Sequence, residues 1–126
     1  MTAPSFPTRL EGAAATSRLE LWLFVAQRIS ALVLAPLVLL HLAVIVYAVQ
    51  GDLSAAEILG RTRGSVLWGG VYGLFVLAVA VHGPIGLRTI VREMTPWHGR
   101  SLDLAAAVLG LFLLAAGLRA VAAVVL

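Results

Sequence analysis

The sequence predicts an all-α, integral membrane protein whose three transmembrane helices form one domain over residues 1–126. Two observations predict this class. Hydrophobic residues make up 61% of the 126 residues and charged residues only 12%, whereas about 25% of a soluble domain is charged. The apolar residues also fall into three long runs, each near the roughly 20 residues that a helix needs to cross a hydrocarbon core of about 30 Å. Lipid must therefore cover most of the surface.

The first helix is expected over residues 17–50, after a tail formed by residues 1–16. Ser17 followed by Glu20 fits a capping box, in which each side chain satisfies a free amide at a helix start. The tail lacks the short apolar core of a cleavable signal peptide, so the first apolar run is expected to stay in the mature protein. Residues 51–64 are expected to form a polar connection.

The second helix is expected over residues 65–92 and the third over residues 102–126. Pro96 lies in the short loop between them and prevents the second helix from continuing. The second helix also contains Pro84, which frees the Ala80 carbonyl and should kink the helix there.

The arginines predict the orientation. All nine basic residues are arginines, scattered between apolar runs rather than clustered on one face, so no nucleic-acid binding is expected. A cytoplasmic N-terminus places six of them inside and three outside, as the positive-inside rule favours. We expect a multi-pass protein of the bacterial cytoplasmic (inner) membrane. The inner arginines are Arg9, Arg18, Arg28, Arg88, Arg92 and Arg100, and the outer ones are Arg61, Arg63 and Arg119.

Several polar residues interrupt the apolar spans, where each costs free energy unless it faces protein, water or a cofactor. Ser30 and His41 are eleven positions apart and share one helix face, with Gln27 within about 40° of it. His82 and Glu93 have the same spacing in the second helix. Each of these helices thus presents a deep histidine with polar groups toward its cytoplasmic end.

Two interpretations of the histidines are open. Neutral imidazole is a common axial ligand of haem iron, and Gly86, one turn below His82, would let a flat macrocycle approach the backbone. Alternatively, an intramembrane histidine only donates a hydrogen bond to a carbonyl of a neighbouring helix. The chain has no cysteine, so it supplies no thiolate ligand to an iron–sulfur cluster.

Two motifs add a family resemblance that covers nearly the whole chain. Residues 27–31, Gln-Arg-Ile-Ser-Ala, resemble the His-Arg-x-Ser-Gly signature in the first helix of the cytochrome b membrane-anchor subunits of succinate dehydrogenase and fumarate reductase, with Gln27 and Ala31 as departures. Residues 82–88, His-Gly-Pro-Ile-Gly-Leu-Arg, are similar to the more specific second-helix signature of that family, His-x-x-x-Gly-Ile-Arg. The three-helix layout and the length agree as well.

The resemblance implies a subunit that is not catalytic alone. It binds haem b and a quinone, and it passes electrons between an iron–sulfur subunit and the membrane quinone pool. His82 matches the family's axial haem ligand, and Arg28 matches an arginine of its quinone site. Ser30, Gln27 and Glu93 are further candidate quinone residues.

His41 lies deeper than His82 by the rise of 1.5 Å per residue. By the same resemblance, the two histidines would each supply one ligand to a different haem, giving one or two haem b groups shared with a partner chain. The three helices would then form half of a haem-binding bundle. The expected partners are the iron–sulfur and flavoprotein subunits and a second anchor chain, which is either distinct or a second copy of this one.

Two alternatives compete with this interpretation. A b-type cytochrome that anchors another membrane dehydrogenase would need the same histidines, and the subunits that co-purify would identify it. A haem-free structural or transport subunit belongs to a different class, and an absorption spectrum would reveal it.

Overall fold

The computed structural model describes residues 6–126, with side chains described from Gly12 onward, and this part of the chain is entirely helical. Its helices are α1 (Phe6–Gln50), α2 (Ala55–Thr62), α3 (Val66–Met94) and α4 (Arg100–Val125). Three of them, α1, α3 and α4, are long and apolar enough to cross a membrane. The predicted class, all-α with three transmembrane helices, is confirmed.

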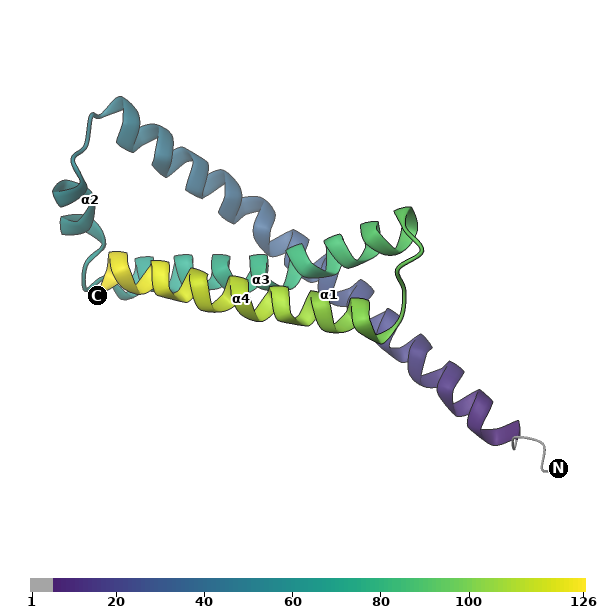
Figure 1. The fold of residues 1–126 in the computed structure, drawn as a ribbon. Coiled ribbons are helices and arrows are strands. Elements are labelled where there is room, and N and C mark those ends of the chain that lie inside the picture. Colours follow the sequence, from purple (N-terminus) through teal and green to yellow (C-terminus); the bar gives the residue numbers. More distant parts are fainter. Residues whose placement is uncertain (1–5) are drawn as a thin grey trace.

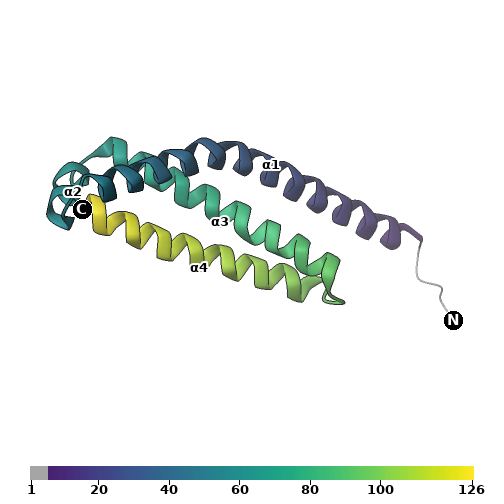
Figure 2. The same ribbon diagram turned by 90° about the horizontal axis from the view of Figure 1, so that it is seen from above.

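The three long helices form an open layer with α3 in the middle (Figures 1 and 2). Helix α3 packs on both α1 and α4, whereas α1 and α4 barely contact each other. The described residues therefore enclose almost no interior, and Ala78 and Leu102 are the hydrophobic residues buried among them. Such a layer leaves wide apolar faces for lipid or for another chain.

Helix α1 begins at Phe6, so the predicted start at Ser17 was wrong. Glu20 does not close a capping box, because it lies inside a continuous helix and its carboxylate reaches arginines of α3. Residues 1–5 of the expected tail lie outside the described residues. The 45 residues of α1 correspond to about 68 Å, more than twice the hydrocarbon thickness of about 30 Å. Its N-terminal part accordingly projects past the ends of α3 and α4 (Figure 1).

Helices α3 and α4 approach closely at glycines of α4. A Cβ atom at Gly117 would lie 2.5 Å from Cγ1 of Val76, and one at Gly110 would lie 3.1 Å from the carbonyl oxygen of Ala80. Pro84 has no amide hydrogen to donate to this carbonyl, so Gly110 packs against the point where the backbone hydrogen bonds of α3 are interrupted. A larger residue at either glycine would push α4 away from the segment of α3 that carries His82.

The predicted polar connection contains helix α2, which the sequence analysis did not predict. Its N-terminus forms the capping box that was expected at Ser17: Ser54 Oγ accepts from the Glu57 amide at 3.3 Å, and the Glu57 carboxylate accepts from the Ser54 amide at 2.8 Å. The amide and hydroxyl of Ser54 hold the pKa of Glu57 below its ordinary value. At the other end, Thr62 Oγ1 donates to the Val124 carbonyl at 2.7 Å, which satisfies a free carbonyl at the end of α4.

Candidate functional site

The candidate site lies where α1 packs against α3, and it joins two of the predicted residues. Ser30 on α1 is buried, with 6% of its surface exposed. Its Oγ lies 3.3 Å from Nδ1 of His82 on α3 and donates to the carbonyl oxygen of Gln27 at 3.1 Å. The half-buried imidazole of His82 is thus held at one ring nitrogen by the neighbouring helix.

The other ring nitrogen of His82, Nε2, makes no hydrogen bond within the described residues. It is also absent from the buried polar atoms of this part of the chain that lack a partner, so it reaches the surface of the chain. An imidazole fixed at Nδ1 and accessible at Nε2 can bind a metal or accept a hydrogen bond from outside the chain.

A groove of about 470 Å³ lies between α1 and α3, one turn from His82. Of the predicted quinone residues, Gln27 and Arg28 line it, whereas Ser30 is turned toward His82 and the exposed Glu93 is not in its lining. Six of its eleven lining residues have polar or charged side chains. The groove is lined by Glu20, Leu23, Phe24, Gln27, Arg28, Ile85, Gly86, Arg88, Thr89, Ile90 and Arg92.

The Gln27 amide lies over Gly86. A Cβ atom at Gly86 would be 3.1 Å from Gln27 Nε2, so Gly86 admits this amide to the α3 backbone. The Gln27 amide thus occupies the space beside Gly86 that was expected to admit a flat macrocycle. The Gln27 Oε1 atom is buried and has no hydrogen-bond partner among the residues described. A buried acceptor without a donor costs about 1–3 kcal/mol, and a donor from a bound molecule would remove this cost.

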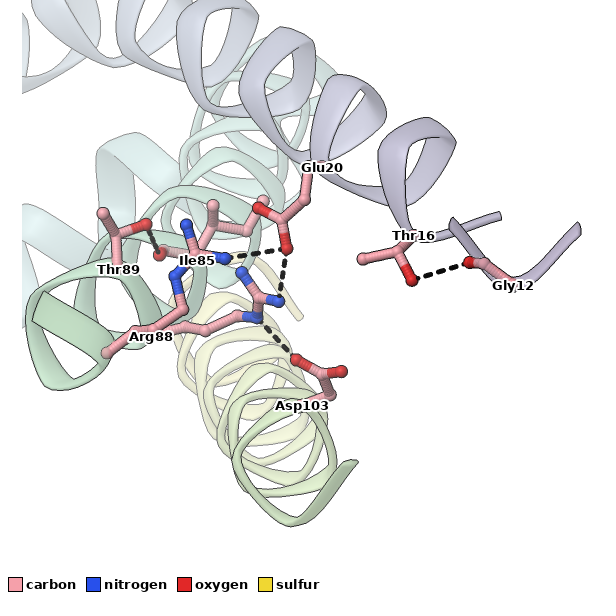
Figure 3. A network of polar contacts seen from close by, with 8 residues as sticks. Gly12, Thr16, Glu20, Ile85, Arg88, Thr89 and Asp103 are labelled. Carbon is pink, nitrogen blue, oxygen red and sulfur yellow. Dashed lines mark hydrogen bonds and ion pairs between the residues drawn. The ribbon is translucent and has the colours of Figure 1, made fainter. Parts of the chain in front are cut away.

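Next to the groove, an ion-pair cluster ties the three long helices together (Figure 3). Arg88 Nη2 of α3 donates to Glu20 Oε1 of α1 at 2.8 Å, and Arg88 Nε donates to Asp103 Oδ1 of α4 at 2.6 Å. Arg92 Nη1 shares the same Glu20 oxygen at 2.9 Å. Two guanidinium groups thus meet two carboxylates, and the cluster carries no formal net charge. We refer to Glu20, Arg88, Arg92 and Asp103 as the arginine cluster.

The sequence did not predict the arginine cluster, because the spacing of Ser17 and Glu20 fits a helix cap and the local pattern gives Asp103 no role. A signal was present: each of the three membrane helices carries a charged residue near the same end, and charged residues near a membrane usually pair. Arg28 stays outside the cluster. Its guanidinium lies 5.3 Å from the centre of the Phe24 ring, and no carboxylate pairs with it in the described part of the chain.

His41 lies at a different level of the layer. Its ring packs edge-on against Tyr72 at 6.0 Å and tilted against Phe75 at 5.3 Å, measured between ring centroids. Its Nδ1 is buried and has no hydrogen-bond partner among the described side chains and backbone. Tyr72 and Phe75 precede His82 by ten and seven residues, which separates the two histidines by about 10–15 Å along α3. One haem iron cannot take both as axial ligands.

A comparison with protein families gives one match. The model of the succinate dehydrogenase/fumarate reductase transmembrane subunit matches residues 7–123, which include every candidate site residue. No curated protein and no solved structure matches the chain significantly.

Proposed function

We propose that this chain, which belongs to the succinate dehydrogenase/fumarate reductase transmembrane subunit family, binds haem b and a quinone. In this proposal it passes electrons between the iron–sulfur subunit of the complex and the membrane quinone pool. One observation carries the proposal. His82 is fixed at Nδ1 by Ser30 and accessible at Nε2, one turn from a groove that contains an arginine without a carboxylate partner among the described residues.

His82 fits the role of an axial haem ligand. A histidine that binds a metal usually donates its second ring N–H to a neighbouring acceptor, which fixes the ring orientation, and Ser30 Oγ is such an acceptor. Haem b supplies a centre that accepts and releases one electron. Because His41 lies about 10–15 Å away along α3, the second axial ligand would come from a partner anchor chain, either a distinct one or a second copy of this chain.

His41 is the candidate ligand of a second haem b, also shared with the partner chain. Its Nε2, like that of His82, is absent from the buried unpartnered atoms of the described chain and so reaches the surface. Unlike His82, it has no hydrogen-bond partner at Nδ1 in the described part of the chain.

Arg28 and Gln27 are the residues best placed to bind the quinone. A quinone oxygen gains negative charge as the ring is reduced, and a nearby cation stabilises that charge. The charges of Arg88 and Arg92 are balanced by Glu20 and Asp103, so within the described residues Arg28 is the cation of the groove without a carboxylate partner. The amide of Gln27 adds a hydrogen-bonding group whose oxygen lacks a partner within the described residues. Ser30 and Glu93, which do not line the groove, would act less directly.

The proposed orientation places this groove at the cytoplasmic face of the bacterial inner membrane. The arginines at this end outnumber those at the α2 end, as the positive-inside rule favours for a cytoplasmic N-terminus. The iron–sulfur and flavoprotein subunits would then dock on the side where α1 projects past α3 and α4 (Figure 1).

Replacing His82 with Ala tests the haem assignment. We expect the reduced-minus-oxidised spectrum of intact membranes to lose the haem b that His82 binds, while the subunits of the complex are still present. His98→Ala is the matched control, because His98 is exposed in the loop after α3 and its Nδ1 contacts the Pro96 carbonyl. An unchanged haem b content in a stably assembled His82→Ala complex would rule the assignment out.

The co-purifying subunits test the partners. A flavoprotein that oxidises succinate, or reduces fumarate, together with an iron–sulfur subunit is the expected result. A dehydrogenase of another substrate would instead make this chain the cytochrome b anchor of that enzyme.

A further inference from the structure

We infer that Ser30 is a positioning residue for His82, and that its hydroxyl selects the imidazole tautomer whose Nε2 lone pair is free to bind iron. This inference rests on the proposed ligation of haem by His82. It moves Ser30 from the quinone groove, where the sequence analysis placed it, to the support of a metal ligand.

The direction of the two hydrogen bonds follows from the atoms involved. A serine hydroxyl has one hydrogen to donate and two lone pairs to accept with. The Gln27 carbonyl oxygen can only accept, so the contact at 3.1 Å uses the single hydrogen of Ser30. The contact at 3.3 Å to His82 must then be an N–H donated by Nδ1 to Oγ. In a neutral imidazole the other nitrogen, Nε2, carries the lone pair.

The opposite tautomer would require the hydroxyl to turn away from Gln27 and donate to Nδ1. A proton would then sit on Nε2, and the ring could not bind a metal there. Two features oppose this arrangement. Ser30 lies inside α1, where a serine readily bonds to a carbonyl of the preceding turn. It is also only 6% exposed, so little water can take over the Gln27 contact.

The hydrogen bond has a measurable consequence. A ligating histidine that donates its second N–H becomes a more basic ligand, and a more basic ligand favours ferric over ferrous iron. Removing the acceptor at Nδ1 should therefore shift the midpoint potential of the His82-bound haem to more positive values. A residue that only fills space at this position would leave the potential unchanged when the volume is kept.

The test is a redox titration of haem b in the purified complex, carried out with three Ser30 variants. Ser30→Ala removes the acceptor, and Ser30→Cys keeps the volume but replaces the oxygen with a weakly accepting sulfur. Both should shift the potential in the positive direction. Ser30→Thr keeps a hydroxyl that can still bond to the preceding turn, so it should restore the parent potential. Thr16→Ala is the matched control, because it removes an exposed α1 hydroxyl that, within the described residues, bonds to the Gly12 carbonyl alone (Figure 3).

The outcomes separate this inference from the proposed function. If His82→Ala loses haem b while Ser30→Ala and Ser30→Cys both keep the parent potential, the role of Ser30 is overturned and haem ligation stands. If His82→Ala retains the full haem b content of the parent in an assembled complex, the proposed ligation itself fails. A positive shift in Ser30→Cys that Ser30→Thr reverses supports the inference, even where Ser30→Ala disturbs assembly.

Discussion

At the end of the molecule where Glu20 pairs with Arg88 and Arg92 of α3, most polar side chains find partners within this chain, whereas near α2 His41 packs against aromatic rings. Ser30 engages His82 at the first end, and the arginine cluster balances its own charges there. At the second end, His41 Nδ1 is buried without a partner in the described residues. At the first end Gln27 Oε1 is the buried side-chain atom left without a partner among the described residues, and the groups around it are held in place by this chain. At the second end, His41 would depend more on a partner chain.

Replacing His41 with Leu should have the largest effect, because it is expected to remove one haem completely. In the parent complex we expect two haem b components in a redox titration, one of which disappears in His41→Leu. A single component that survives the substitution would reduce His41 to a residue that packs against Tyr72 and Phe75. The second end would then have no cofactor role, and the first end alone would be a functional site.

Replacing Arg88 with Leu should destabilise the first end, because it removes the central ion pairs of the arginine cluster. The substitution removes the two hydrogen bonds that Arg88 makes to Glu20 and Asp103, and a hydrogen bond to a charged group contributes about 1.5–3 kcal/mol. Because both carboxylates are partly exposed, we expect the lower value for each bond, about 3 kcal/mol in total. The measurement is the temperature at which the detergent-solubilised complex dissociates. Arg88→Lys keeps the charge but not the two-sided geometry and should lower it less; equal temperatures for Arg88→Leu and the parent would contradict a stabilising role.

Replacing Arg28 with Leu separates quinone chemistry from assembly. Loss of one charge-stabilising group should slow quinone reduction about 100-fold, or about 2.7 kcal/mol, while succinate oxidation with a soluble acceptor stays intact. Arg63→Leu is the control, since this exposed arginine lies in the connection near α2. If both activities of Arg28→Leu fell together, Arg28 would be needed for assembly and not for the quinone.

Replacing Thr62 with Val tests the anchoring of α2 and should have the smallest effect. The substitution keeps the shape of this buried side chain but removes its hydrogen bond to the Val124 carbonyl, at a cost of about 1 kcal/mol. The dissociation temperature should fall slightly and the haem spectrum should not change. A loss of haem comparable to that of His41→Leu would show that α2 supports the second end directly.

Much of this protein could be predicted from particular residues. The long apolar runs gave three membrane helices, because a chain with 12% charged residues cannot cover itself in water. The helical period placed Gln27, Ser30 and His41 on one side of α1, and all three do face α3 or its groove. Local signals were less secure. The Ser17 and Glu20 pattern met the requirements of a capping box, yet the box forms at Ser54 and Glu57 instead.

The sequence by itself determined that lipid surrounds the helices, and it determined which residues could bind a ligand, since hydropathy and residue type are properties of the chain. Only the tertiary structure decided which of those residues meet. Ser30 and His82 are 52 positions apart, and Glu20 and Arg88 are 68 apart. Their contacts depend on how far each helix is rotated and shifted against its neighbour. Helix packing fixes that rotation, through close approaches such as that of Gln27 on α1 to Gly86 on α3, and no periodicity within a single helix contains it.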